Sequence, residues 1–456
     1  MSASRLPRLK REMRESARLS IPLVLGQLSA VAMNVVDTLI AGHHSALALA
    51  GVAVGSAVWS LAIMIALGVM MALPPSVSHL AGAGRRAEIG PLFRQALWLA
   101  LALGFGLFVL VRQSGPLLAA MGIDAEVLPG ARDFLGGLSW GAPALVLYLA
   151  FRYLSEGVAL TRPTMVFGIG GLLLLIPLGI GLMHGVCGLP ALGPYGLGLA
   201  TAFVLWCQAA GMGLYLWSSP RYADLRLFDR VDPPRAAAIA ELLRIGLPMG
   251  VSIFMEGSLF VATALIIGTL GTVAVAAHQV AINIASACFM VPLGIAMATT
   301  VRVGHASGAG DASAVRWAAG GGYALTALAQ VGSALLLFFG ASLIARAYTD
   351  DAEVAALAAQ LMALAAVFQL SDGLQAASGG ALRGLKDTRV PMVITVLAYW
   401  CVGMPLGWWL GIAQGAGPQG MWIGLIAGLS VAAVLLTLRF SRLSGRDAQS
   451  RPSIRA

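Results

Sequence analysis

The sequence carries little charge for its length. Asp, Glu, Lys and Arg together make 11% of the 456 residues, where about 25% is usual in soluble proteins. Apolar residues make 59% of the chain, and 56 glycines are added to them. In soluble chains, apolar residues and glycine together make only roughly 45–50%. The chain therefore lacks the polar residues that would cover a soluble protein of this size, which excludes an enzyme of two or three ordinary cytosolic domains.

Lysine is almost absent, and the motifs of ATP-driven and zinc-dependent proteins are missing. Lys10 and Lys386 are the only lysines, and neither lies in the Gly-Lys-Ser/Thr context of a phosphate-binding loop. No His-Glu-x-x-His run occurs. The four cysteines are widely separated in the chain, which favours neither a disulfide framework nor a metal-binding pair: Cys187, Cys207, Cys288 and Cys401. We therefore expect neither an enzyme nor a bound cofactor.

Long apolar runs are what the chain does contain. A helix needs about 20 apolar residues to span a bilayer, and twelve such runs can be recognised, approximately at residues 19–40, 47–73, 92–111, 133–153, 164–183, 195–217, 242–268, 273–300, 317–340, 354–377, 390–412 and 419–438. The first run follows a charged segment and contains Pro22 and Asp37, so we expect a retained span and no cleaved signal peptide. The predicted fold class is an all-α integral membrane protein with twelve transmembrane helices.

The net charge of +9 reflects the placement of the basic residues. Lys and Arg gather in the N-terminal segment, in every second connection between apolar runs, and in the C-terminal segment, whereas the other connections are nearly free of them. Basic connections stay on the cytoplasmic side of a membrane. We therefore predict cytoplasmic N- and C-termini, and we do not expect a nucleic-acid partner.

The two halves of the chain resemble each other. An ungapped shift of 226 residues aligns 21–84 with 247–310 and gives 19 identities in 64 positions, where about six are expected by chance. Six spans per half put both halves in the same orientation, related by a pseudo-two-fold axis along the membrane normal. The predicted parts are an N-terminal tail (1–18), an N-lobe (19–217), a linker (218–241), a C-lobe (242–438) and a C-terminal tail (439–456). Two such lobes suit alternating access about a central site.

Three acids lie well inside predicted spans: Asp37, Glu256 and Asp372. No Lys or Arg lies at comparable depth in this interpretation. A carboxylate in the bilayer interior is costly, so each of the three is expected to be neutralised by a proton or by a bound cation. The alternative is that each one forms a hydrogen bond to a neighbouring helix in its neutral form. The repeat places Asp37 and Glu256 in opposite lobes.

Other polar residues in the spans are weaker candidates. Asn34 lies one turn before Asp37 and is expected to share its proton or cation, with ordinary hydrogen bonding between helices as the alternative. Gln279, Asn283 and Gln369 lie in later spans and are further candidates near a substrate or cation. Pro22 removes a helical amide donor and is expected to permit a bend in the first helix, with a static kink as the alternative.

Several segments, in order along nearly the whole chain, carry a resemblance to a known family. These segments are VVDTLIAG (35–42), FMEGSLF (254–260), VAAHQVAIN (275–283), RVGHASGAGD (302–311) and LSDGLQAASGGALRGLKDT (370–388). The chain resembles the NorM-like branch of the multidrug and toxic compound extrusion (MATE) family. The resemblance implies a twelve-helix, V-shaped exporter of cationic amphipathic compounds in the bacterial inner membrane, driven by inward sodium or proton flow. It also implies that Asp37, Glu256 and Asp372 are the coupling acids.

Two departures from the NorM-like pattern bear on the coupling ion. Asparagines that are frequent in the fifth helix are absent from Leu175–Gly179, and Phe368 replaces a tyrosine that is common one turn before the acid of the tenth helix. Both changes remove oxygen ligands, and a sodium ion, by analogy with other hard cations, needs several of them. We therefore predict proton-driven antiport through Asp37, with any sodium confined to Glu256 and Asp372.

The leading hypothesis is a cation-coupled (H⁺ or Na⁺) multidrug efflux antiporter, which confers antibiotic resistance and acts as a monomer on small organic cations such as dyes and antibiotics. The alternative is a flippase for a lipid or a lipid-linked headgroup with a related two-lobed architecture. A flippase would need buried Arg or Lys residues to bind an anionic headgroup, and none is predicted at depth.

Overall fold

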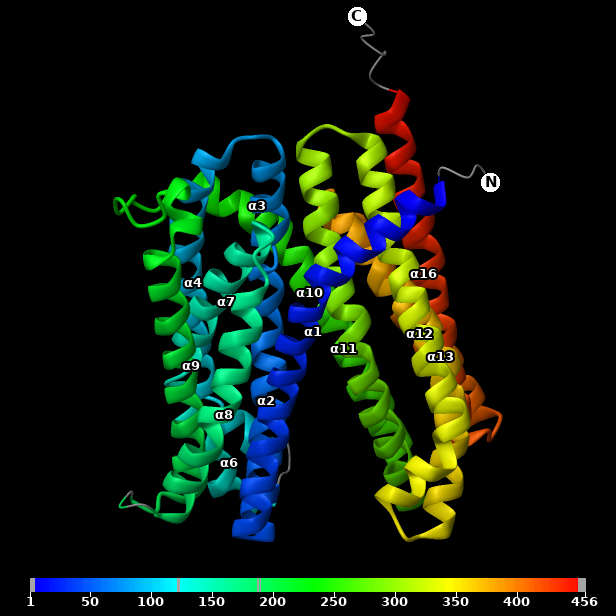
Figure 1. The fold of residues 1–456 in the computed structure, drawn as a ribbon. Coiled ribbons are helices and arrows are strands. Elements are labelled where there is room, and N and C mark those ends of the chain that lie inside the picture. Colours follow the sequence, from blue (N-terminus) through cyan, green and yellow to red (C-terminus); the bar gives the residue numbers. More distant parts are fainter. Residues whose placement is uncertain (1–4, 121–123, 187, 189, 450–456) are drawn as a thin grey trace, which may run out of the picture. The chain divides into compact units, whose positions relative to one another are not determined.

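The computed structural model describes residues 5–120, 124–186, 188 and 190–449, and this part of the chain folds into helices without a strand (Figure 1). Cys187 and the outermost residues of both predicted tails lie outside the described residues. Eleven helices are long and apolar enough to cross a membrane, and a pair bent by 48°, Val127–Ser139 with Ala142–Gly157, makes a twelfth span if it is counted as one. The predicted all-α, twelve-span membrane protein is confirmed.

The first half of the chain forms ten helical elements up to the linker. They are α1 (Arg5–His44), α2 (Ala46–Met70), α3 (Leu73–Gly82), η1 (Arg86–Glu88), α4 (Ile89–Arg112), α5 (Gly115–Ala120), α6 (Val127–Ser139), α7 (Ala142–Gly157), α8 (Arg162–His184) and α9 (Gly193–Ser218).

The linker and the second half continue the series. They are η2 (Pro220–Leu225), α10 (Ala236–Gly268), α11 (Thr272–Gly308), α12 (Ala312–Tyr348), α13 (Ala352–Gly384), α14 (Arg389–Val396), η3 (Leu397–Gly403), α15 (Met404–Trp408), η4 (Trp409–Ala413) and α16 (Gly417–Gln449). Two of these elements, η3 and η4, are π-helical.

The chain divides into two compact units whose boundaries follow the repeat. Residues 25–250 form one unit, and residues 1–24 with 251–456 form the other. The boundaries fall two residues after Pro22 and two residues after Pro248, the pair of prolines that the repeat aligns. Each of the long helices α1 and α10 therefore begins in one unit and ends in the other.

The internal repeat extends to the backbone. Gly84 and Gly310, which a shift of 226 aligns, end their helices with φ of 73° and 70°. A Cβ on Gly157 would lie 2.7 Å from Val77 Cβ, and a Cβ on Gly384 would lie 2.7 Å from Val303 Cβ. Both helix pairs therefore approach equally closely, and a side chain at either glycine would push the helices apart. The two halves are duplicated in three-dimensional packing as well as in sequence.

The fifth span of the first repeat differs in regularity from its counterpart in the second. In the first half, α8 is a regular helix of 23 residues, whereas the aligned span Arg389–Ala413 has 25 residues and contains η3 and η4. A π-turn is wider than an α-turn and is found mostly as a short bulge within an α-helix, frequently at functional sites. The longer span of the second repeat contains both π-helical segments.

Each unit has its own packed interior. In the unit of residues 25–250, α9 packs against α6, α7 and α8, while α4 packs against α7. In the other unit, α13 is central and packs against α11, α12 and α16. Its apolar core includes Phe368, Tyr399 and Trp422.

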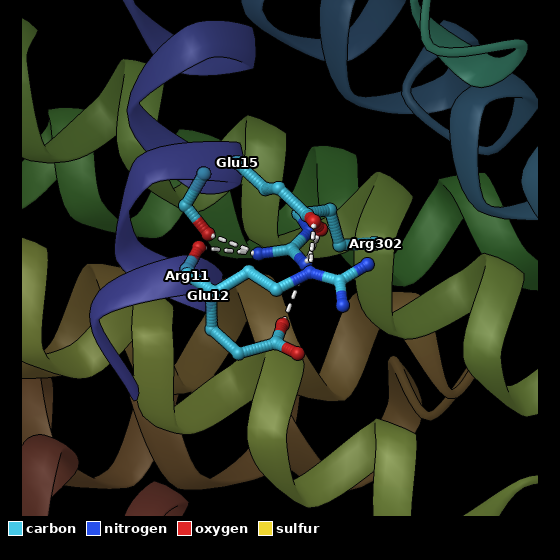
Figure 2. A network of polar contacts seen from close by, with 5 residues as sticks. Arg11, Glu12, Glu15 and Arg302 are labelled. Atoms are coloured by element: carbon cyan, nitrogen blue, oxygen red, sulfur yellow. Dashed lines mark hydrogen bonds and ion pairs between the residues drawn. The ribbon is translucent and has the colours of Figure 1, made fainter. Parts of the chain in front are cut away.

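The segment predicted as an N-terminal tail is helical from Arg5 and packs on the unit that contains α11. Arg302 of α11 donates hydrogen bonds to Glu12 Oε2 at 2.5 Å and to Glu15 Oε2 at 2.7 Å (Figure 2). The same guanidinium reaches Ser16 Oγ and the carbonyl of Glu12, each at 2.7 Å. Only 12% of the Arg302 side chain is exposed, so this network anchors the first turns of α1.

The linker between the halves lies against α4. Arg94 donates to Asp232 Oδ2 at 2.6 Å and to the Arg226 carbonyl at 2.8 Å. Gln95 accepts from the Arg235 amide at 2.6 Å, and Trp98 Nε1 donates to the Asp232 carbonyl at 2.8 Å. The linker is therefore part of the folded unit of residues 25–250.

Candidate functional site

Asp37 lies in the second half of α1 and is 3% exposed. Thr201 of α9 holds its hydroxyl 3.2 Å from Asp37 Oδ1 and 3.3 Å from Oδ2. The same hydroxyl is 3.2 Å from the Leu197 carbonyl. One hydroxyl proton serves only one acceptor at a time, so Thr201 can donate to Asp37 or to its own helix. Thr201 was not a candidate from the sequence, since a threonine in an apolar helix gives no signal of a distant partner.

Asp372 of α13 and Glu256 of α10 form a second acidic site, within the other unit. Asp372 is 3% exposed, and its Oδ1 has no hydrogen-bond partner among the described residues. Glu256 is half-buried, and its charge acts on Asp372. Arg383 of α13 also acts electrostatically on Glu256, so a cationic side chain lies nearer to this acid than we predicted.

Tyr399 was not a candidate from the sequence. It lies in η3, is fully buried, and its hydroxyl has no hydrogen-bond partner among the described residues. The charges of Glu256 and Asp372 both act on this hydroxyl. The adjacent Trp400 donates from Nε1 to the carbonyl of Met255 at 3.3 Å, which fixes η3 beside α10 at the level of Glu256.

Aromatic and amide side chains surround Asp372 on its own helix. Phe368, one turn earlier, packs edge-on against Phe260 and Trp422, with ring centroids 6.1 and 5.7 Å apart. Gln369 is fully buried and donates to the carbonyl of Ala285 at 2.9 Å. Gln369 therefore joins α13 to α11, and its predicted role beside a cation stays a prediction.

Three of the remaining predicted residues, Asn34, Gln279 and Asn283, are exposed. The Asn34 amide reaches the Ala30 carbonyl at 3.5 Å, within its own helix, and does not contact the Asp37 carboxyl. Gln279 donates to Asn283 at 3.1 Å along an exposed face of α11. Pro22 is buried, and α1 continues through it without a break. The bend predicted at this residue stays a prediction. The hydrogen bonds given for Asn34, Gln279 and Asn283 do not involve an acid, and the predicted roles of these residues stay predictions.

A buried ion pair at the end of α7 involves Glu156, an acid that was not among the three predicted inside spans. In α7, Arg152 donates to Glu156 Oε1 at 2.6 Å, and these side chains are 8% and 1% exposed. Arg152 also donates to Gln27 at 2.7 Å, and Thr164 donates to Glu156 at 3.1 Å. The predicted span ends at residue 153, whereas α7 continues four residues further and packs inside the unit, so Glu156 lies outside the predicted span. Arg152 Nε and Nη2 and Glu156 Oε1 all form hydrogen bonds to described residues, which indicates a structural pair.

One Gly-x-Ser-x-Gly run, Gly137–Gly141, carries no catalytic geometry. Ser139 is fully buried at the end of α6, and its hydroxyl donates to the Gly136 carbonyl at 2.7 Å. A nucleophilic serine needs an exposed hydroxyl beside a general base, so this run belongs to the bend between α6 and α7.

A two-fold repeated helical membrane fold with an isolated acidic site in each unit defines a class of transporter. The MatE family model matches the chain twice, at residues 22–180 and 248–409. The two matches begin 226 residues apart, which is the shift found in the sequence. The chain belongs to the MatE family.

Relatives and solved structures agree with that assignment over nearly the whole chain. A protein named probable multidrug resistance protein NorM from Xanthomonas campestris is 52% identical, covering 98% of this chain and 97% of its own. Multidrug resistance protein PmpM from Pseudomonas aeruginosa is 41% identical, covering 97% and 94%. A structure described as the outward-facing conformation of a multidrug resistance MATE family transporter of the MOP superfamily superposes with a TM-score of 0.88 at 19% identity, covering 96% of this chain and 97% of its own. These relatives are transporters and not enzymes.

Proposed function

We propose that this protein is a cation-coupled multidrug efflux antiporter that exports cationic amphipathic compounds by alternating access. The observation that carries the proposal is that two deeply buried acids form no ion pair with a described Lys or Arg. Asp37 and Asp372 are each 3% exposed, and neither forms an ion pair with a described Lys or Arg, in contrast to Glu156. A buried carboxyl group without a Lys or Arg in an ion pair can be neutralised in turn by a proton, a metal cation or an organic cation.

Thr201 supports a proton as the coupling ion at Asp37. When Asp37 is ionised, the Thr201 hydroxyl donates to it. When Asp37 is protonated, its own O–H can donate to Thr201, whose proton then serves the Leu197 carbonyl. Both protonation states therefore have satisfied hydrogen bonds, so a proton can enter and leave without leaving a buried polar group unpaired. Sodium, by this proposal, is confined to Glu256 and Asp372.

A lipid flippase is the less supported alternative. A structural neighbour from Pyrococcus furiosus, described as a MOP superfamily transporter whose reverse pocket polarity suggests a different function, shares the fold with a TM-score of 0.86 at 20% identity. The fold alone thus does not decide the cargo. An anionic headgroup requires available buried cations, whereas Arg152 is occupied by Glu156 and Gln27. The named multidrug relatives also favour drug export.

The proposed setting is the bacterial inner membrane, with both termini in the cytoplasm and one copy of the chain as the working unit. The basic residues of the N-terminal segment, the linker and the C-terminal segment support this orientation. The proposed cargo is small organic cations such as dyes and antibiotics, and the proposed coupling ions are H⁺ and Na⁺.

Transport in proteoliposomes tests the proposal. A pH gradient without sodium should drive movement of a cationic dye, and Asp37→Asn should abolish it. Asp350→Asn removes an exposed acid and serves as the control, which should transport like the unmodified protein. Transport that responds only to a sodium gradient would overturn the assignment of the proton to Asp37, and no gradient-driven transport at all would overturn the antiporter.

A further inference from the structure

The linker between the halves has one buried side and one exposed side. Val231 is 86% exposed, and the side chains of Arg226 and Arg230 are 81% and 66% exposed. Three other apolar side chains of the linker pack into the unit of residues 25–250 and are at most 3% exposed: Tyr222, Leu225 and Leu227. A single exposed apolar side chain is common on proteins, so the surroundings of Val231 decide what it can bind.

A hydrogen bond places Val231 beside the apolar outer face of α4. Trp98, Leu101 and Phe105 lie at helical spacing on one face of this span and are 37%, 43% and 67% exposed. An exposed apolar face of this kind on a membrane-spanning helix lies against lipid. Trp98 Nε1 donates to the carbonyl of Asp232 at 2.8 Å, and tryptophan is enriched where the bilayer meets water. Val231, the residue before Asp232, therefore lies at the membrane–water interface.

Side chains of α4 hold the linker in this place. Arg94 donates to Asp232 Oδ2 at 2.6 Å, and these two side chains are 8% and 7% exposed. Gln95 donates to the Pro233 carbonyl at 3.0 Å and accepts from the Arg235 amide at 2.6 Å. A surface that is already ordered loses less entropy when it binds a ligand. The exposed side of the linker is therefore a surface of fixed geometry.

The charge on the exposed side of the linker is positive. Residues 220–235 contain four arginines and three aspartates. Two of these acids pair with arginines outside the linker: Asp224 with Arg86, and Asp232 with Arg94, each at 2.6 Å. Among the acids of the linker, this leaves Asp229 to balance four arginines. A basic cluster at the membrane–water interface attracts anionic headgroups.

We propose that Val231, Arg226 and Arg230 form a binding surface for anionic phospholipids of the cytoplasmic leaflet. The inference rests on the proposed function only for the orientation that puts the linker on the cytoplasmic side. The two guanidinium groups bind phosphate oxygens, while Val231 contacts acyl chains beside the apolar face of α4. Arg230 is 2.9 Å from Asp232 Oδ1, but an exposed ion pair contributes little free energy, so its guanidinium can also bind a lipid phosphate.

The first test is hydrogen exchange of residues 220–235 in nanodiscs of phosphatidylcholine with and without phosphatidylglycerol. Both lipids carry a phosphate, but only phosphatidylglycerol has a net negative charge. We expect phosphatidylglycerol to slow exchange of the linker several-fold in the unmodified protein, because a ligand that binds the docked linker stabilises it. This slowing should disappear when Arg226→Gln and Arg230→Gln are combined. High salt should also weaken it, since exposed charges are screened.

Native mass spectrometry of the purified protein measures the lipid preference directly. With phosphatidylglycerol and phosphatidylcholine of identical acyl chains, Arg226→Gln and Arg230→Gln should each weaken phosphatidylglycerol binding about five-fold and leave phosphatidylcholine binding unchanged. Val231→Ser should weaken the binding of both lipids. Arg346→Gln changes an exposed arginine at the end of α12 in the other unit and is the matched control, which should behave like the unmodified protein.

The outcomes separate the lipid surface from other ligands and from the transport function. Equal linker exchange in the two lipid mixtures, or a slowing that survives in the combined arginine variant, overturns the inference. If sn-glycerol 3-phosphate, which lacks acyl chains, slows exchange as much as phosphatidylglycerol, the surface binds free phosphate and the lipid assignment is wrong. Dye transport driven by a pH gradient in phosphatidylcholine liposomes should persist in the combined variant. Its absence from the unmodified protein would remove the proposed function without changing the exchange result.

Discussion

Thr201 on α9 places its hydroxyl within 3.3 Å of both carboxyl oxygens of Asp37 on α1. Replacing Thr201 with Val keeps the shape of the side chain but leaves the ionised carboxylate without this donor. Losing a hydrogen bond to a buried charged group costs about 1.5–3 kcal/mol, so efflux driven by a pH gradient should fall about ten-fold or more. The initial rate of dye efflux at equal expression measures this. Thr201→Ser keeps the hydroxyl and should retain most of the activity, whereas full activity in Thr201→Val would contradict the role of this contact.

The acids of the other unit are expected to be essential for transport and dispensable for folding. Glu256→Gln and Asp372→Asn should abolish efflux, while membrane insertion and the amount of folded protein stay unchanged, because removing a costly buried charge does not harm the fold. Efflux assays paired with size-exclusion profiles of the purified variants check both parts. Asp311→Asn, which changes an exposed helix cap, is the control. Normal cation-driven transport by the Glu256 and Asp372 variants would exclude them from coupling.

The sign of the cargo charge follows from the sign of the buried groups. Cationic dyes should be exported, and anionic dyes of matched size and apolarity should not, because the candidate sites offer carboxyl groups and the buried Arg152 is already paired. Cells that express the protein can be loaded with either dye, and efflux can be followed with and without an ionophore. Comparable export of both dyes would favour the flippase interpretation.

The network at the start of α1 should contribute to stability. Arg302→Ala would leave Glu12 without its ion-pair partner and Glu15 with Arg11 alone. Breaking a fully buried pair costs about 3–5 kcal/mol, so this pair, which is 12% and 16% exposed, should contribute about 2 kcal/mol to the free energy of unfolding. Thermal unfolding and hydrogen exchange of residues 5–24 measure the loss. Arg11→Ala, in an exposed pair with Glu15, is the control and should cost less than about 1 kcal/mol.

The docking of the linker on α4 should depend on acid pH. The hydrogen bond from Arg94 holds the pKa of Asp232 below its usual value of 3.8. Because the pKa is lower in the folded state than in the unfolded state, the stabilisation is fully present above pH 3.8 and is lost as the pH falls through the folded value. Hydrogen exchange of residues 220–235, corrected for intrinsic rates, should therefore quicken below about pH 4.

A pair of variants isolates that linker effect. Asp232→Asn should make the linker exchange faster near neutral pH and remove the acid dependence. Asp229→Asn changes an exposed acid of the same linker, 3.9 Å from Arg226, and should behave like the unmodified protein. An acid dependence that survives in Asp232→Asn would assign it to another group.

Much of the architecture could be predicted from local sequence. The spans follow from apolar runs long enough to cross a bilayer, and the repeat follows from identities at one fixed shift. The aligned glycines Gly157 and Gly384 confirm in packing what the alignment indicated, since each faces a valine at the same distance. Asp37 and Asp372 were recognisable because an acid in an apolar run stands out at any position, and the structure buries both.

The partners of those acids could not be predicted in the same way. Thr201 is 164 positions from Asp37, so no local pattern could indicate that contact. Tyr399 lies in the π-helical segment η3, which no residue pattern predicts. The amides Asn34 and Gln369 were chosen for their closeness in sequence to an acid, and the structure gives each a hydrogen bond elsewhere.

The sequence by itself determined that the chain is a duplicated, twelve-span membrane protein with isolated acids, because hydrophobic length, composition and repetition are local properties that the bilayer converts directly into helices. Only the tertiary structure decided which side chains meet those acids, that Arg152 and Glu156 satisfy each other, and that the chain passes between its two units just after Pro22 and Pro248. These features depend on how helices pack and on the rotation of each helix about its axis. A single π-turn or an extra helical turn changes that rotation, and neither can be recognised from composition or periodicity.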